Sequence, residues 1–263
     1  MGIGGRRGRP VIGLPRGAVR PSPIFVGLVA LTITGAVMAW YDIGNQSLNI
    51  FLFVVAGWLV SLSLHEFAHA VFAYRAGDTS VVGRGYLTLN LLKYTHPILS
   101  VVLPVIFILL GGIGLPGGAV YVDRHSVRTR MGDSLISAAG PAVNVLFTIA
   151  LTVPFWFGVD VFAHLAFWGG LAMLAFLQLT ASLLNLLPVP GLDGGNMLRP
   201  WLSYEWGRRF DVIAPYGMLA LFLLLFEPRV NRIFFEVVFW ISDLIGLPPG
   251  LYEVGRQLLM FWD

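Results

Sequence analysis

The sequence has no cysteine and few charged residues. The lack of cysteine excludes disulfides, thiolate metal sites and cysteine nucleophiles. Only 12% of the 263 residues are charged, whereas soluble domains carry about 25%. Hydrophobic residues make up 57% of the chain, and the formal net charge is a small +3. The basic residues do not form the Lys/Arg cluster with interleaved aromatic residues that is typical of a nucleic-acid-binding face. The composition therefore indicates an integral membrane protein with no nucleic-acid partner.

Long apolar runs predict an α-helical polytopic membrane protein with about six transmembrane helices. A helix that crosses a bilayer needs roughly 17–25 mainly apolar residues. The candidate spans are Ile24–Trp40, Leu48–Arg75, Ser134–Phe157, Val161–Leu187 and Val212–Phe226. A further run, Ile233–Leu247, contains Glu236 and Asp243, so it is either a sixth crossing or a helix that lies in the membrane interface.

The part of the chain between the second and third of these runs has different patterns. In Gly85–Leu91 polar or aromatic residues alternate with leucine, and a period of two predicts a β-strand. Gly118–Val122 is a candidate second strand, so we expect a short β-hairpin or sheet here. Pro97–Ile113 is apolar but contains Pro104 and ends in a glycine-rich stretch. This favours a re-entrant segment over a full crossing.

The stretch Ser61–Tyr74 places three polar side chains, His65, Glu66 and His69, inside an apolar helix. Such residues are costly in a membrane and need partners. Residues four apart share one face of a helix, so both imidazoles can reach a single metal ion. The alternative is a structural role, in which all three side chains form hydrogen bonds with neighbouring helices. The arrangement of the three inside an apolar run favours metal binding. Zinc suits two imidazoles and a carboxylate, and a zinc-bound water has a pKa of about 7, so Glu66 can act as its general base.

Two histidines leave a zinc site one protein ligand short, and Asp193 is the best candidate for the third. It follows a proline- and glycine-rich turn (PVPGLDGG). Taken alone, an aspartate in such a turn is more simply a turn former. The other acidic residues lie in loops or near the C-terminus, except Glu66, which has the base role.

Asn144 and Asn185 are the other polar residues of interest in the apolar helices. Each needs hydrogen-bond partners in a membrane. One interpretation is a hydrogen bond between helices. The other is a donor near the cleaved carbonyl or a clamp on the substrate backbone.

In combination these motifs resemble the site-2 protease family of intramembrane zinc metalloproteases, in the prokaryotic branch without PDZ or CBS domains. The similar motifs are HEFAH at His65–His69, Gly140-Pro141-x-x-Asn144, and Asn185-x-x-Pro188-x-Pro190-x-x-Asp193-Gly194. The resemblance covers roughly Leu48–Leu198. Gly191 departs from it, because a bulkier residue or proline is expected at that position.

The resemblance implies that His65, His69 and Asp193 bind one catalytic Zn²⁺ and that Glu66 is the general base. It assigns Asn144 and Asn185 to the substrate-binding lining of the site. The implied activity is hydrolysis of peptide bonds within or near transmembrane segments of single-span substrates, such as an anti-sigma factor or another membrane-tethered regulator. An exposed strand edge at Gly85–Leu91 could hold the unwound substrate by strand addition.

Arginine placement predicts the topology in the cytoplasmic membrane. Residues 1–22 are arginine-rich and predict a disordered cytoplasmic tail. If Pro97–Ile113 is re-entrant, Asp193 returns to the side of the two histidines, and the active site faces the cytoplasm. We expect a metalloprotease domain over residues 23–228, with its core at 48–198, and a membrane-associated or transmembrane helical segment over 229–263.

Two other function classes remain open at the level of sequence. One is a metal-binding membrane protein without peptidase activity, either a transporter or an inactive relative. A transporter should show internal repeats and a polar path through several helices, and neither is evident. The other is a membrane scaffold, which would not need a glutamate between the two histidines.

Overall fold

The computed structural model describes residues 13–15, 17–94 and 121–261, and these contain helices but no β-strand. The long helices are α1 (Pro23–Trp40), α2 (Gln46–Ala76), α5 (Arg130–Trp156), α6 (Leu165–Leu186), α8 (Tyr204–Leu225) and α9 (Pro228–Leu244). The shorter elements are α3 (Ser80–Gly83), η1 (Tyr86–Thr88), η2 (Leu91–Lys93), α7 (Asp193–Leu198), η4 (Arg199–Trp201) and α10 (Pro249–Leu259).

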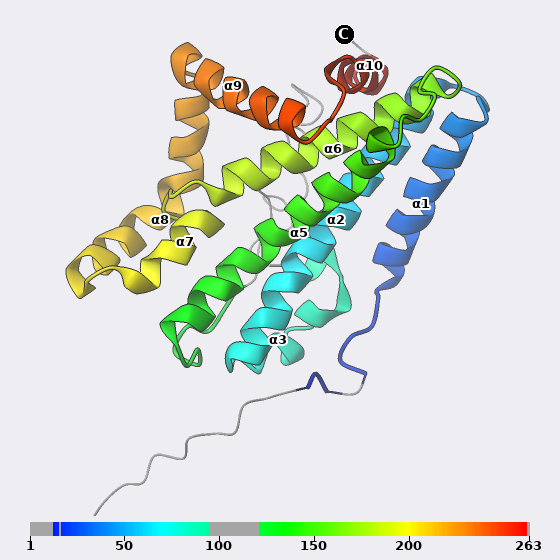
Figure 1. Cartoon of the computed structure of the whole chain (residues 1–263). Helices are drawn as coiled ribbons and strands as arrows, with labels where there is room; N and C mark the ends of the chain where they lie inside the picture. The colour runs from blue at the N-terminus through cyan, green and yellow to red at the C-terminus, as the bar shows by residue number, and fades with distance from the viewer. Residues whose placement is uncertain (1–12, 16, 95–120, 262–263) are drawn as a thin grey trace, which may run out of the picture.

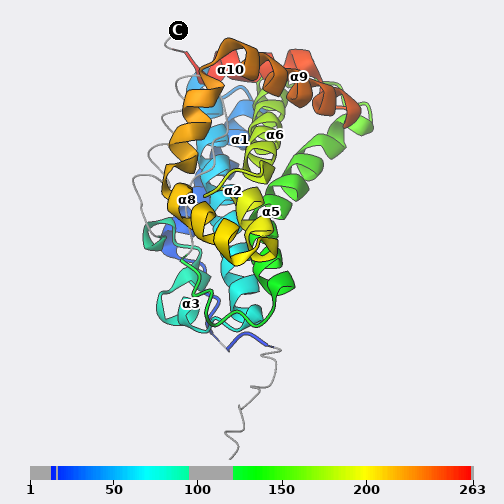
Figure 2. The ribbon, with the colours of Figure 1, turned by 90° about the vertical axis from the view of Figure 1, so that its left-hand side faces the viewer.

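Four of the described helices, α1, α2, α5 and α6, are long and apolar enough to cross a membrane. They lie side by side as a bundle in Figures 1 and 2. Helix α6 is the central member, and most of its side chains are buried against α2, α5 and α10. Side-chain caps from Ser22, Asn45 and Thr129 begin α1, α2 and α5. The predicted helical membrane architecture is therefore confirmed.

The end of α2 and the start of α5 lie at one end of the bundle. The backbone N–H of Arg128 donates to the carbonyl of Ala76 at 3.3 Å. The carboxylate of Asp78 accepts from the backbone N–H groups of Ser80 at 2.9 Å and Asp123 at 2.8 Å. The chain thus enters α5 where it left α2. The re-entrant segment predicted at Pro97–Ile113 lies outside the described residues.

The predicted strand at Gly85–Leu91 is wrong. This segment instead forms the 3₁₀ turns η1 and η2. Gly85 and Leu89 have left-handed φ values of 73° and 54°, which break an extended chain. The alternating pattern is misleading because Tyr86 is buried in the same core as Leu87, so the alternating residues do not divide into a core face and a solvent face. Of the second candidate strand, Gly118–Val122, only residues 121 and 122 are described, and neither is in a strand.

The expected six crossings are not supported. The described residues contain four candidate spans, or five if α8 and α9 form one broken span with a 93° bend. Helix α8 begins with charged residues, so only its C-terminal part matches the predicted run Val212–Phe226. Helices α9 and α10 lie across one end of the bundle (Figures 1 and 2). For Ile233–Leu247 this arrangement favours the interface alternative over a separate crossing.

Candidate active site

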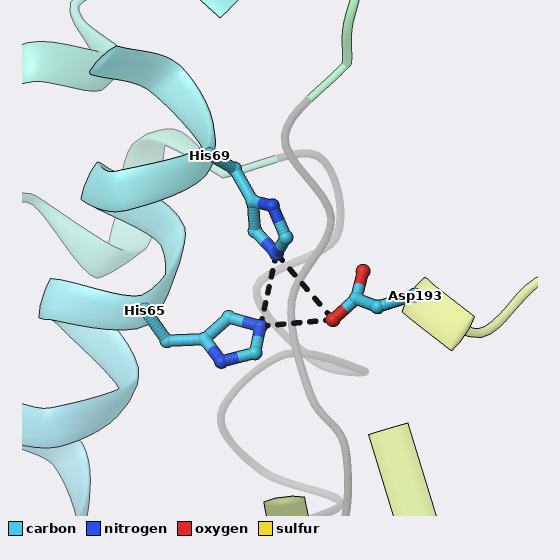
Figure 3. Close-up of side chains that lie close together, drawn as sticks. All are labelled: His65, His69 and Asp193. Carbon is cyan, nitrogen blue, oxygen red and sulfur yellow. Dashed lines mark hydrogen bonds and ion pairs between the residues drawn. The ribbon is translucent and has the colours of Figure 1, made fainter. Parts of the chain in front are cut away.

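Both histidines of the HEFAH motif lie in the C-terminal half of α2 and face the interior of the bundle. His65 and His69 are 4% and 7% exposed. Because they are four residues apart on one helix, their rings share a face, and the two Nε2 atoms are 3.0 Å apart. Figure 3 shows both rings pointing toward Asp193.

Asp193 begins α7, directly after the turn that ends α6. Its Oδ2 lies 3.2 Å from His65 Nε2 and 3.4 Å from His69 Nε2. The three donor atoms lie within 4.8 Å of one another. The structure thus brings together the residues that the sequence predicted as a metal site, although they are far apart in the chain (Figure 3).

Glycine at position 191 shapes the turn that delivers Asp193. Gly191 has a φ of 91°, which proline cannot adopt and other residues adopt only with strain. A β-carbon here would also collide with the carbonyl oxygen of Ala214 in α8. The bulkier residue or proline expected from the family pattern would therefore not fit this turn.

The outer nitrogen of each ring has a partner that orients it. His69 Nδ1 lies 2.6 Å from the backbone carbonyl oxygen of Ile136, which can only accept, so Nδ1 carries the proton. His65 Nδ1 lies 2.8 Å from Asn144 Oδ1, and with the amide oriented this way Nδ1 is again the donor. Both Nε2 lone pairs then face Asp193. Ligand imidazoles in metal sites are typically held by such outer hydrogen bonds.

The space between the donors exists because residue 140 has no side chain. Gly140 lies one helical turn before Asn144 on α5, on the same face. A β-carbon at this position would collide with the Nε2 atoms of both His65 and His69. Two neutral imidazoles and a carboxylate are the donor set of a catalytic zinc site with one position left open. The residues present therefore fit a zinc ion.

Glu66 is adjacent to the first ligand and is 1% exposed. Tyr94 lies near it: burial raises the pKa of Tyr94, and the charge of Glu66 raises that pKa further. The hydroxyl of Tyr94 also donates to the carbonyl of Ser63 at 3.3 Å. The sequence did not single out Tyr94.

Asn185 is 5% exposed and lies in the last turn of α6, before the turn to Asp193. Asn144 is also buried, at 5% exposure, but its amide contacts a ligand ring. The sequence singled out Gly140 and Asn144 as one motif. Their spacing of four, which places both on one face of α5, is the signal that could have linked Gly140 to the site.

Comparison with curated proteins finds relatives over most of the chain. The chain is 48% identical over 255 residues to "Putative zinc metalloprotease Rip2" of Mycolicibacterium smegmatis, covering 94% of this chain and 96% of the relative. It is 46% identical over 254 residues to the protein of the same name in Mycobacterium tuberculosis, with the same coverage. It is 30% identical over 189 residues to "Putative zinc metalloprotease YwhC" of Bacillus subtilis, covering 69% of this chain and 83% of the relative.

No family model matches the sequence, and no solved structure matches it. Two other findings agree on the family: near-complete alignment with relatives named as zinc metalloproteases, and a His65–His69–Asp193 cluster that can hold one metal ion. The chain belongs to the site-2 protease family of zinc metalloproteases.

Proposed function

We propose that this zinc metalloprotease cuts peptide bonds within or near the transmembrane segments of single-span proteins. The depth of the cluster carries the proposal. At a rise of about 1.5 Å per residue, His69 lies about 10 Å from the end of α2, and Gly140 lies about 15 Å from the start of α5. Both helices are long and apolar enough to cross a membrane. This depth along two candidate spans supports cleavage within the hydrocarbon core rather than in the surrounding water.

In this proposal His65, His69 and Asp193 hold the zinc ion, and Glu66 is the general base. Bound zinc supplies a Lewis acid and lowers the pKa of water. The carboxylate of Glu66 takes the proton of the attacking water and then gives it to the leaving amine. Asn144 holds the His65 ring through its 2.8 Å contact, so we assign it to positioning the ligand in addition to lining the site.

The substrate must be unwound locally, because the carbonyls of an intact helix are hydrogen-bonded and crowded by side chains. The turns at residues 85–93 offer no strand edge, so we propose that groups on the helices hold the unwound segment. Asn185, buried beside the turn to Asp193, is the candidate substrate contact. Asn185→Ala should raise KM and leave zinc content unchanged, and loss of zinc in that variant would instead indicate a structural role.

We further propose that the chain lies in the cytoplasmic membrane with the site facing the cytoplasm. The N–H of Ser22, at the start of α1, donates to the carbonyl of Thr88 at 2.9 Å, so α1 starts at the end where α2 finishes and α5 begins. The loop before α5 at this end carries Arg124 and Arg128. Arginines favour the cytoplasmic side. Anti-sigma factors and other membrane-tethered regulators are the substrate class to test.

Cleavage of single-span peptides by the purified protein tests the proposal. Wild type should cut them, and a chelator should stop cleavage. Glu66→Gln should keep its zinc and lose cleavage. Glu236→Gln, the same change at an exposed position on α9, is the matched control and should behave as wild type.

Mapping the cut sites by mass spectrometry tests whether cleavage occurs within or near the transmembrane segment of the substrate. Cuts confined to soluble tails, more than a few residues from the span, would refute it. Cleavage by Glu66→Gln would remove Glu66 from the base role.

A further inference from the structure

An arginine-lined cavity of about 710 Å³ lies between the start of α5 and the start of α8. Its basic lining residues are Arg124, Arg128, Arg130, Arg199 and Arg208, and its acidic ones are Asp133 and Asp211. Five arginines against two aspartates leave an excess of three positive charges. The proposed hydrolysis does not use this cavity.

Ion pairs fix two of the arginines in the walls of the cavity. Arg124 contacts Asp133 Oδ1 at 2.7 Å. Arg199 contacts Asp211 with both Nε, at 2.9 Å, and a terminal nitrogen. The second pair ties η4 to α8, so the walls come from separate segments held in place. Planar guanidinium groups bind phosphate oxygens through paired hydrogen bonds.

Two helix starts add to the positive potential of the cavity. Thr129 caps α5 and accepts from the N–H of Gly132 at 2.9 Å. Ser203, directly before α8, also lines the cavity. The N-terminal ends of helices carry partial positive charge. Helix starts and arginines therefore favour the same kind of ligand, an anion.

Exposed aromatic residues beside this cavity are the kind that gather at the level of the lipid headgroups. Trp201, Tyr204 and Trp206 are 53%, 86% and 62% exposed around the start of α8. Tryptophan and tyrosine concentrate where a membrane meets water. Further along α8, Val212 and Ile213 are 67% and 51% exposed. An anionic group in the cavity would thus have apolar protein surface beside it for acyl chains.

We propose that this cavity binds the phosphate of an anionic phospholipid headgroup, with the acyl chains along α8. The apolar face favours a lipid over an acidic peptide segment, which would need the positive charge but not the adjoining apolar surface. The site would lie next to α7, because Ser134 Oγ in α5 donates to the carbonyl of Met197 at 2.7 Å. The proposal does not depend on the protease activity.

Lipid binding to the full-length protein in detergent tests the proposal by native mass spectrometry. Phosphatidylglycerol is titrated against phosphatidylcholine, and inorganic phosphate and an acidic single-span peptide are each titrated separately. The test variant is Arg130→Gln with Arg208→Gln. The matched control is Arg229→Gln with Arg232→Gln, two exposed arginines on α9 at the other end of the bundle. Zinc content reports whether each variant is folded.

Wild type and the control should prefer phosphatidylglycerol, and the test variant should bind it about 30-fold more weakly. This follows from about fivefold per arginine near an anionic surface. Equal binding of the two lipids by wild type, or equal losses in both variants, would overturn the proposal. Inorganic phosphate binding as tightly as phosphatidylglycerol would show a free-phosphate site instead. Tighter binding of an acidic single-span peptide than of the lipid, lost in the test variant, would show a peptide site.

Discussion

Replacing Gly140 with alanine should remove zinc from the protein while leaving it folded. The β-carbon of the new residue would collide with the Nε2 atoms of His65 and His69 and lie 2.6 Å from His65 Cε1. A zinc ion binds imidazole nitrogen at about 2.0–2.1 Å. The added methyl group therefore takes the volume that the ion needs.

The expected loss of zinc affinity is at least about 100-fold. Removing a hydrogen bond from a metal-binding histidine typically costs about 10–100-fold, and blocking the position of the ion should cost more. The fold should tolerate the change. Alanine gains about 1 kcal/mol over glycine inside a helix, and overpacking costs about 1–3 kcal/mol. The net effect on stability is between none and a loss of about 2 kcal/mol.

Zinc content by atomic absorption, together with competition against a chromogenic chelator, measures the loss. Thermal unfolding of the same samples reports the fold. Gly27→Ala is the matched control, because it is also a glycine in an apolar helix and its β-carbon would meet nothing within 4 Å. If Gly140→Ala binds zinc with wild-type stoichiometry and affinity, then the ion does not lie between these three donors.

Three further predictions concern one ligand contact and the stability of the loop that follows α2. Asn144→Ala should weaken zinc binding by about 10–100-fold, whereas Asn144→Asp, which still accepts the histidine proton, should keep most of it in the same chelator competition. Gly85→Val should lower stability by about 1–2 kcal/mol in thermal unfolding, whereas a strand would tolerate or favour valine. Asp78→Ala should cost about 1–3 kcal/mol, because it removes the acceptor for the N–H groups of Ser80 and Asp123, and an unchanged unfolding temperature would contradict this.

The ligand cluster could be predicted because its signals are local or chemical. The spacing of His65 and His69 places both rings on one helical face whatever surrounds the helix. The donor set needs one more carboxylate, which predicts Asp193 as the third ligand, and the structure places its Oδ2 within 3.4 Å of both rings. Donor chemistry thus identified a contact that no local pattern predicts.

The failed strand shows where periodicity is insufficient. Alternation predicts a strand only if one set of side chains faces solvent, and in Gly85–Leu91 both Tyr86 and Leu87 are buried. Gly85 adopts a φ of 73°, and this left-handed conformation turns the backbone instead of continuing it as an extended strand. A membrane-associated segment can bury aromatic and aliphatic residues together, so the contrast on which the rule depends is lost. The span count failed for a related reason, because apolar composition does not reveal the 93° bend between α8 and α9.

The structural roles of two glycines were the hardest features of the site to predict from the sequence. In the sequence Gly140 belongs to a motif, and Gly191 departs from the family pattern. Their roles depend on neighbours from distant segments: the histidines of α2 for Gly140, and the carbonyl of Ala214 for Gly191. A site that needs empty space at one point is specified by an absent side chain, and the need appears only when α2 and α8 are in place. Gly140 and Gly191 therefore constrain the site as strongly as the donors, although neither contributes a ligand atom.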